Sequence, residues 1–204
     1  MRLQAFARTG EGARAPARAS ADAWCRAYKS TSLDVDRKEG CQQQQGRTVR
    51  FEIRSDGSGS PKGGPAGIGF VVLADGLPFS EGSHPVAVAT HQQAELLAAV
   101  HALNSLPAGH HVELRSDSKF VVKGFNDWLP EWRARDWRRL TGGPVAHIPL
   151  WRRLIAAVER HRTVQFVWIP RAENKQADRL AGQGRMAAVE AIRSPGMNTA
   201  GFIS

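Results

Sequence analysis

The chain has 204 residues, 42% of them hydrophobic, and its 28 Lys or Arg against 19 Asp or Glu give a formal net charge of +9. This composition is sufficient for one ordinary domain with a core, and the pI of about 10.5 favours a polyanionic partner such as nucleic acid. No apolar run reaches the roughly 18 residues of a membrane helix, so we expect no membrane partner. Two cysteines, Cys25 and Cys41, exclude a disulfide framework or zinc site and favour a reducing, cytoplasmic setting.

Residues 1–47 differ from the rest of the chain. They are rich in Ala and Arg without a usable period, and Gln42 to Gln45 form a polar run. This composition predicts a disordered basic extension. An organelle transit peptide or a start codon assigned too far upstream would give the same pattern, and both alternatives stay open. We place the folded domain at residues 48–187 and a flexible tail at 188–204.

The first half of the domain reads as three strands linked by turns. Residues 49–55 alternate like a strand, and a Gly/Pro-rich turn follows at 57–65. A second strand at 66–73 leads through Ala74-Asp75-Gly76 into a third at 77–82. The glycine-rich turn matches no phosphate-binding loop, so a hairpin connection is the better interpretation.

Helices and strands alternate in the second half. Thr90 and Gln93 form a capping box, which predicts a helix that ends before Pro107 and Gly109. The remaining predictions are a strand at 112–116, helices at 118–128 and 148–160, a strand at 164–169 and a last helix at 173–186.

Two hexapeptides share one pattern. Residues 51–56 and 112–117 both read apolar, Glu, apolar, Arg, Ser, Asp, and each Asp is in phase with the charged residues. If the two strands are parallel neighbours, Asp56 and Asp117 meet at one edge of a sheet. Crowded carboxylates repel one another and require a metal ion or a proton between them. Alternatively, each Asp starts a turn or caps a helix.

Two further acidic residues have structural alternatives. Glu95 lies near a helix start, where the helix dipole favours an anion. Asp178 lies within the last predicted helix, where pairing with Lys175 or Arg179 would explain it.

The segment 128–140 interleaves three tryptophans with four arginines. Arginine planes and indole rings both contact nucleic acid well. The segment also fits an amphipathic helix with its Trp face in the core. Both interpretations stay open for the tryptophans, whereas the arginines favour binding.

The order of these elements and acidic residues resembles the type 1 ribonuclease H family over residues 48–187. The stretches that carry the resemblance are Asp56-Gly57-Ser58, Ala94-Glu95-Leu96-Leu97-Ala98, Ser116-Asp117-Ser118, and Asn174 with Asp178-Arg179-Leu180-Ala181. The implied fold class is α/β, a five-stranded mixed sheet flanked by helices, in which strands one to three are antiparallel and strands one, four and five are parallel.

The resemblance implies a nuclease that hydrolyses the RNA strand of RNA–DNA hybrids and leaves 5′-phosphate and 3′-hydroxyl ends. Its catalytic and metal-binding carboxylates would be Asp56, Glu95, Asp117 and Asp178, holding two Mg²⁺ ions, with Mn²⁺ as the alternative. Asp56 would bridge both ions. Glu95 and Asp117 would hold the ion nearer the leaving oxygen, and Asp178 the ion that activates water.

The resemblance also implies a surface for the hybrid and a monomeric enzyme. Expected substrate-binding residues are Gly57, Ser58, Lys62, Thr90, Gln92, Trp128, Trp132, Arg133, Arg135 and Asn174. Three features depart from the family pattern. The connection 168–174 lacks the histidine-containing loop of many members, and Lys62 and His91-Gln92 stand where asparagines are usual.

Two alternatives of other classes remain. One is a catalytically weak hybrid-binding module, which the four carboxylates disfavour. The other is a nuclease or integrase domain of related fold with another substrate, which the arginine–tryptophan segment disfavours.

Overall fold

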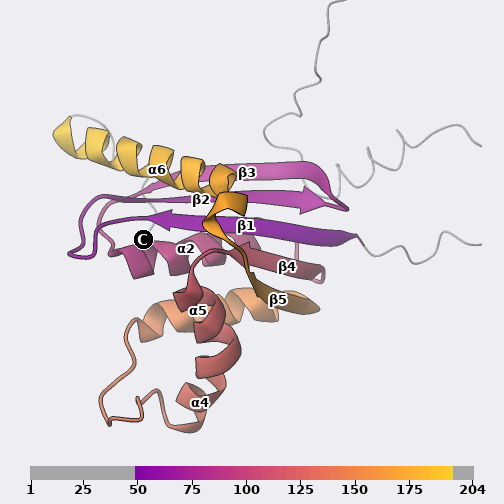
Figure 1. Ribbon diagram of the computed structural model, residues 1–204, viewed down its shortest axis with the longest axis vertical. Helices are drawn as coiled ribbons and strands as arrows, with labels where there is room; N and C mark the ends of the chain where they lie inside the picture. Colours follow the sequence, from indigo (N-terminus) through magenta and orange to yellow (C-terminus); the bar gives the residue numbers. More distant parts are fainter. Residues whose placement is uncertain (1–48, 195–204) are drawn as a thin grey trace, which may run out of the picture. The chain divides into compact units, whose positions relative to one another are not determined.

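Five strands form one mixed sheet in the order β3-β2-β1-β4-β5 (Figure 1). The computed structural model describes residues 49–194, so the predicted extension at 1–47 lies outside the described residues. The strands are β1 (Arg50–Ser58), β2 (Ala66–Ala74), β3 (Leu77–Val86), β4 (His111–Ser116) and β5 (Thr163–Trp168). β1, β2 and β3 are antiparallel neighbours, whereas β1, β4 and β5 run parallel. The predicted fold class is confirmed.

The two hexapeptides lie side by side in matching register. Phe51 pairs with Val112 and Arg54 pairs with Arg115, so Asp56, near the end of β1, and Asp117, just after β4, reach the same edge of the sheet. The register also sets Glu52 beside Glu113. Arg115 neutralises this pair, because its guanidinium lies 2.6 Å from Glu113 Oε1 and 3.4 Å from Glu52 Oε2.

The helices lie on both faces of the sheet. They are α2 (His91–Asn104), α3 (Lys119–Lys123), α4 (Leu129–Ala134), α5 (Ile148–Glu159) and α6 (Lys175–Arg193), with a π-helical turn η1 (Gly124–Trp128) and a 3₁₀ turn η2 (Arg171–Glu173). Every residue of α2 from Ala94 to Val100 is buried. The predicted capping box is present, since Thr90 Oγ1 accepts from the Gln93 amide and Gln93 Oε1 accepts from the Thr90 amide.

β2 is buried on both faces because α2 and α6 cover opposite sides of it. Ile68 packs in one cluster with Ala94 and Leu97 of α2. Gly67 and Gly69 point the other way, where a Cβ on Gly69 would lie 2.3 Å from the backbone nitrogen of Ala181 in α6. This close approach requires glycine and fixes the position of α6 against the sheet.

Four predicted boundaries were wrong. β1 extends beyond Ser55 to Ser58, into the predicted turn. β3 extends beyond Gly82 to Val86. The helix predicted at 118–128 is instead α3 followed by η1, which brings the Gly124 backbone against the buried Trp151 ring, 2.3 Å from where a Cβ would stand. α6 continues past Met186 to Arg193, because residues 187–193 are mostly strong helix formers. Residues 188–193, which the sequence analysis assigned to the tail, belong to this helix.

No helix in the part of the chain from 49 to 194 combines the length and the apolar character needed to cross a bilayer.

Candidate active site

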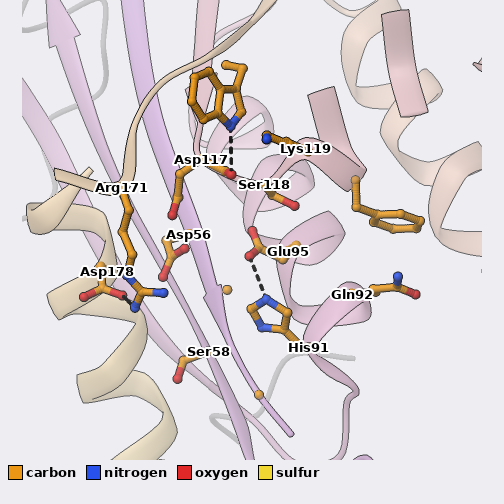
Figure 2. Close-up of a pocket in the computed structure, with 14 residues that line it drawn as sticks. Asp56, Ser58, His91, Gln92, Glu95, Asp117, Ser118, Lys119, Arg171 and Asp178 are labelled. Atoms are coloured by element: carbon orange, nitrogen blue, oxygen red, sulfur yellow. Dashed lines mark hydrogen bonds and ion pairs between the residues drawn. The ribbon is translucent and has the colours of Figure 1, made fainter. Parts of the chain in front are cut away.

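A cleft of about 640 Å³ opens where β1 and β4 end, and all four predicted carboxylates line it (Figure 2). Its lining residues are Asp56, Gly57, Ser58, Gly59, His91, Gln92, Glu95, Asp117, Ser118, Lys119, Phe120, Trp168, Arg171 and Asp178. The carboxylates come from four elements: β1, α2, the turn after β4, and α6. The structure therefore brings together residues that are far apart in sequence.

Asp56 lies near the end of β1 and is 5% exposed. The next residue, Gly57, touches α2 directly, because a Cβ there would lie 2.3 Å from the backbone nitrogen of Glu95. Only glycine permits this approach. The contact between β1 and α2 therefore sets Asp56 and Glu95 on the two sides of one short gap.

Glu95 is also 5% exposed and comes from the second turn of α2. Its Oε1 lies 3.3 Å from Nε2 of His91, one turn earlier on the same helix. Its Oε2 is buried without a hydrogen-bond partner. A buried carboxylate oxygen of this kind is costly unless a cation or a proton reaches it.

Asp117 is held by an amide. Its Oδ1 accepts from Nδ2 of Asn174 at 2.7 Å, and the same Nδ2 donates to the Ser55 carbonyl at 3.0 Å. Asn174 is 1% exposed, so its side chain is fixed between β1 and the start of α6. The backbone oxygen of Asp117 also accepts from the indole of Trp168 at 3.1 Å.

Asp178 lies in the first turn of α6 and pairs with Arg171. The Arg171 Nη2 is 2.5 Å from Asp178 Oδ1, and Figure 2 shows this guanidinium entering the cleft from the η2 side. Neither Lys175 nor Arg179, the partners considered from the sequence, forms this ion pair. Arg171 comes from the short connection that replaces the longer histidine-containing loop.

Crowding and burial shift the proton affinity of the two deepest carboxylates. Burial, together with the charges of Asp117 and Asp178, raises the pKa of Asp56 from its usual 3.8 to about 7. Burial and the charge of Asp56 raise the pKa of Glu95 well above its usual value. Arg171 acts in the opposite direction on both groups. The cleft is thus a concentration of negative charge with one nearby compensating arginine.

The other predicted substrate-binding residues are spread more widely. Gly57, Ser58 and Gln92 line the cleft, whereas Asn174 lies beneath it. Thr90 serves as the helix cap, with its hydroxyl already accepting a hydrogen bond. Lys62 is exposed and outside the cleft lining.

The arginine–tryptophan segment lies away from the cleft lining. Trp132 is half-buried, with its ring centroid 5.3 Å from that of Trp151, whereas Trp128 is 38% exposed. Arg135 pairs with Glu131 at 3.2 Å, and Arg133 is exposed. The core alternative therefore describes Trp132, while Trp128 and Arg133 face solvent.

Sequence reasoning missed the roles of four cleft residues. His91 pairs with Glu95 and Arg171 pairs with Asp178, so each contacts one of the predicted catalytic carboxylates. Trp168 and Lys119 close one wall, with the Lys119 ammonium 5.3 Å from the Trp168 ring centroid. The position of His91 four residues before Glu95 on a helix could have indicated its contact; Arg171 had no such local signal.

The cleft could bind a divalent cation, although its side chains do not form a complete coordination shell by themselves. No group of three His, Cys, Asp or Glu side chains within residues 49–194 is already arranged to hold a metal ion. Mg²⁺ is commonly bound by one or two carboxylates, waters and substrate phosphates rather than by a complete protein cage. Two features fit a cation site. Glu95 Oε2 is buried without a hydrogen-bond partner, and burial together with crowding by other carboxylates raises the pKa of Asp56. A bound cation would satisfy the oxygen and offset the repulsion between the carboxylates.

The sheet order and the acidic cleft define the class: an α/β protein with a carboxylate site at the edge where two parallel strands end. A family model described as RNase H matches residues 49–186. A ribonuclease H of Aromatoleum aromaticum is 37% identical over 160 residues, covering 76% of this chain and 99% of that protein. One of Stutzerimonas stutzeri is 36% identical over 149 residues, covering 71% and 95%.

Solved structures agree with the sequence comparisons. The N-terminal RNase H domain of a Mycobacterium tuberculosis protein superposes with a TM-score of 0.57 at 29% identity, covering 71% of this chain and 99% of that one. RNase H1 from Halobacterium salinarum gives 0.54 at 28% identity, covering 68% and 98%. The chain belongs to the ribonuclease H family and is a ribonuclease H enzyme.

Proposed function

We propose that this ribonuclease H is a type 1 enzyme that uses divalent metal ions to hydrolyse the RNA strand of RNA–DNA hybrids, leaving 5′-phosphate and 3′-hydroxyl ends. The observation that carries the proposal is the gathering of Asp56, Glu95, Asp117 and Asp178 around one open cleft. All four come from a single chain, which supports a monomer as the active unit.

The four carboxylates are the proposed metal-holding residues. Two bound Mg²⁺ ions would supply an activated water and stabilise the charge that develops on the leaving 3′ oxygen. Asp56 is the proposed shared ligand, because Figure 2 places it among the other three. Glu95 and Asp117 would serve on the leaving-group side, and Asp178 on the water side.

Other side chains hold these ligands in place. Asn174 donates to Asp117 and ties it to the Ser55 carbonyl, so Asp117 has one fixed oxygen and one left for a cation. His91 contacts one oxygen of Glu95 and leaves the other free. Arg171 neutralises Asp178, and a cation held by Asp178 would compete with this ion pair.

Recognition of RNA is proposed to take place at the cleft rim. Gly57 and Ser58 present the end of β1, and Gln92 stands at the start of α2, so backbone and amide groups flank the carboxylates. Such groups can contact a 2′-hydroxyl in the shallow minor groove of a hybrid. The exposed Trp128 and Arg133 are proposed to contact the DNA strand.

A single cleavage assay tests the proposal. Labelled RNA–DNA hybrid, duplex DNA and duplex RNA are each incubated with Mg²⁺, with Mn²⁺ and with EDTA. We expect cleavage of the hybrid's RNA strand alone, dependent on metal and abolished by Asp117→Asn. Product ends are identified by their susceptibility to phosphatase and to 3′ extension.

Three results would count against the proposal. Cleavage that persists in Asp117→Asn or in EDTA would refute the proposed site. Hybrid binding without cleavage would support the catalytically weak binding module instead. Equal cleavage of duplex DNA would indicate a nuclease of this fold with a broader substrate.

A further inference from the structure

A second hollow on the surface adjoins the catalytic cleft. This α6 groove has a volume of about 560 Å³ and is lined by Ser58, Arg179, Gly182, Gln183, Arg185, Met186 and Val189. Ser58 also lines the catalytic cleft, so the two hollows meet at the end of β1. Figure 2 shows Ser58 beyond Asp56, between β1 and α6.

The two hollows differ in charge. The catalytic cleft combines four carboxylates with the cations Lys119 and Arg171. The α6 groove contains two arginines and no acidic residue. Arg179 and Arg185 are both exposed, and neither forms an ion pair within residues 49–194.

The helix geometry aligns the groove with the catalytic cleft. Arg185 follows Asp178 by seven residues, which is close to two turns, so both side chains stand on one side of α6 roughly 10.5 Å apart along its axis. Between them Gly182 leaves open space, since a Cβ there would meet nothing within 4 Å. Gly69 of β2 packs against Ala181 and fixes the helix that carries this face.

We propose that the α6 groove binds backbone phosphates of the strand being cut, beyond the catalytic cleft. The inference rests on the proposed function, because it takes the strand that crosses Asp178 to be the RNA of a hybrid. Arg185 stands roughly 10.5 Å along α6 from Asp178, so it would meet a phosphate a few nucleotides from the scissile one. Arg179 and Arg185 thus add positive charge beside the acidic cleft.

The test compares a double variant with matched controls. Arg179→Ala/Arg185→Ala removes the groove charges, and Arg179→Lys/Arg185→Lys retains them. Arg162→Ala is the control. Arg162 is also exposed, but it lies just before β5, at the N-terminal ends of the parallel strands, whereas the catalytic cleft opens at their C-terminal ends. Hybrid binding is measured against salt concentration in the inactive Asp117→Asn background, and cleavage kinetics are measured in the active one.

The salt dependence gives the sharpest expectation. Each lost phosphate contact lowers the slope of log affinity against log salt by roughly 0.9, so the double alanine variant should lose about 1.8. Between 50 and 200 mM salt, its affinity should therefore fall roughly tenfold less than that of the parent. KM should rise while kcat at saturating hybrid stays unchanged, and the lysine variant and Arg162→Ala should match the parent.

A set of shortened hybrids locates the contact. RNA shortened from the side that faces α6 loses the phosphates that reach Arg185 before those that reach Arg179. The affinity difference between the parent and the double alanine variant should therefore fall in steps and disappear when both contacts are lost, whereas shortening the other end should preserve it.

Two outcomes would overturn the inference, and they are distinguishable. If the parent cleaves hybrids but the double alanine variant keeps its affinity and salt slope, the groove inference alone is wrong. If the parent neither binds nor cleaves a hybrid, the proposed function fails and the inference fails with it. Circular dichroism confirms that each variant is folded.

Discussion

The four carboxylates of the cleft divide into two pairs with different surroundings. Asp56 and Glu95, the floor pair, are each 5% exposed, and burial raises the pKa of both. Asp117 and Asp178, the rim pair, are more exposed, and each already has a polar partner: Asn174 for Asp117 and Arg171 for Asp178.

The difference shows where a cation is most needed. Each rim carboxylate already has a polar partner in the protein, whereas the floor holds a carboxylate oxygen with no hydrogen-bond partner. A metal ion that enters the cleft therefore gains most from Asp56 and Glu95. We expect substitutions in the floor to change both stability and catalysis, and substitutions around the rim partners to change catalysis or metal affinity more modestly.

The largest expected effect is the loss of cleavage when a floor ligand is neutralised. Asp56→Asn or Glu95→Gln should lower kcat by at least roughly a thousandfold, since removing one charge-stabilising group from an active site has effects of that order. Hybrid cleavage under saturating Mg²⁺ measures the loss. Retention of more than about a tenth of the parental kcat would show that the floor does not carry the proposed metal chemistry.

The next effect concerns stability without metal. The folded protein holds the Asp56 proton up to a pKa of about 7, whereas the unfolded chain releases it near 3.8, so stability falls as pH rises between these values. Asp56→Asn removes this penalty and should be more stable than the parent at pH 8 by roughly 4 kcal/mol, the free-energy equivalent of such a pKa difference.

Urea denaturation of metal-free protein at pH 4 and pH 8 measures that difference. It should nearly vanish at pH 4, where the Asp56 carboxyl is protonated in the folded chain. Asp178→Asn is the matched rim control, because its side chain is 40% exposed and paired with Arg171. If Asp178→Asn stabilised the protein equally, burial would not distinguish the floor pair from the rim pair.

A smaller effect is expected from the amide that holds Asp117. Asn174→Ala removes the donor to Asp117 Oδ1 and to the Ser55 carbonyl, and such supporting contacts typically contribute 10–100-fold to activity or metal affinity. The Mg²⁺ concentration at half-maximal rate should rise by roughly that factor. Unchanged Mg²⁺ dependence with only a lower melting temperature would assign Asn174 a purely structural role.

The smallest effect should come from Arg171, and its sign is informative. Arg171→Ala removes a positive charge that occupies Asp178, so metal should bind more tightly, by several-fold at most because the pair is exposed. Calorimetric titration with Mn²⁺ measures the affinity directly. Arg171→Lys should stay near the parent, and weaker binding by the alanine variant would show that Arg171 assists metal binding rather than competing with it.

Most of the sheet and most of the carboxylates could be predicted from the sequence, because both are marked by regular patterns of residues. The matching hexapeptides predict two half-buried strands, and their register in the structure brings Asp56 and Asp117 to one edge. The capping box fixed the start of α2 and hence the position of Glu95. Asp178 lacked any local pattern and was recovered only through the order of elements in the resemblance.

The rest depended on contacts that no local pattern encodes. Arg171 reaches Asp178 because η2 turns the chain back over α6, and a three-residue turn has no periodicity to detect. The π turn places the Gly124 backbone against Trp151, a residue far along the sequence that no local pattern connects to it. The helix was predicted to end at Met186, whereas strong helix formers continue α6 to Arg193.

The packing of α6 against Gly67 and Gly69 has a consequence for the synthesis of the enzyme on the ribosome. Asp178 and Asn174 arrive with the last described element, so a nascent chain that has not yet released α6 from the ribosome lacks both. Such a chain cannot assemble the cleft of four carboxylates, so we expect it not to cleave hybrids. Hybrid cleavage by ribosome-arrested chains ending before Lys175 would contradict this order of events.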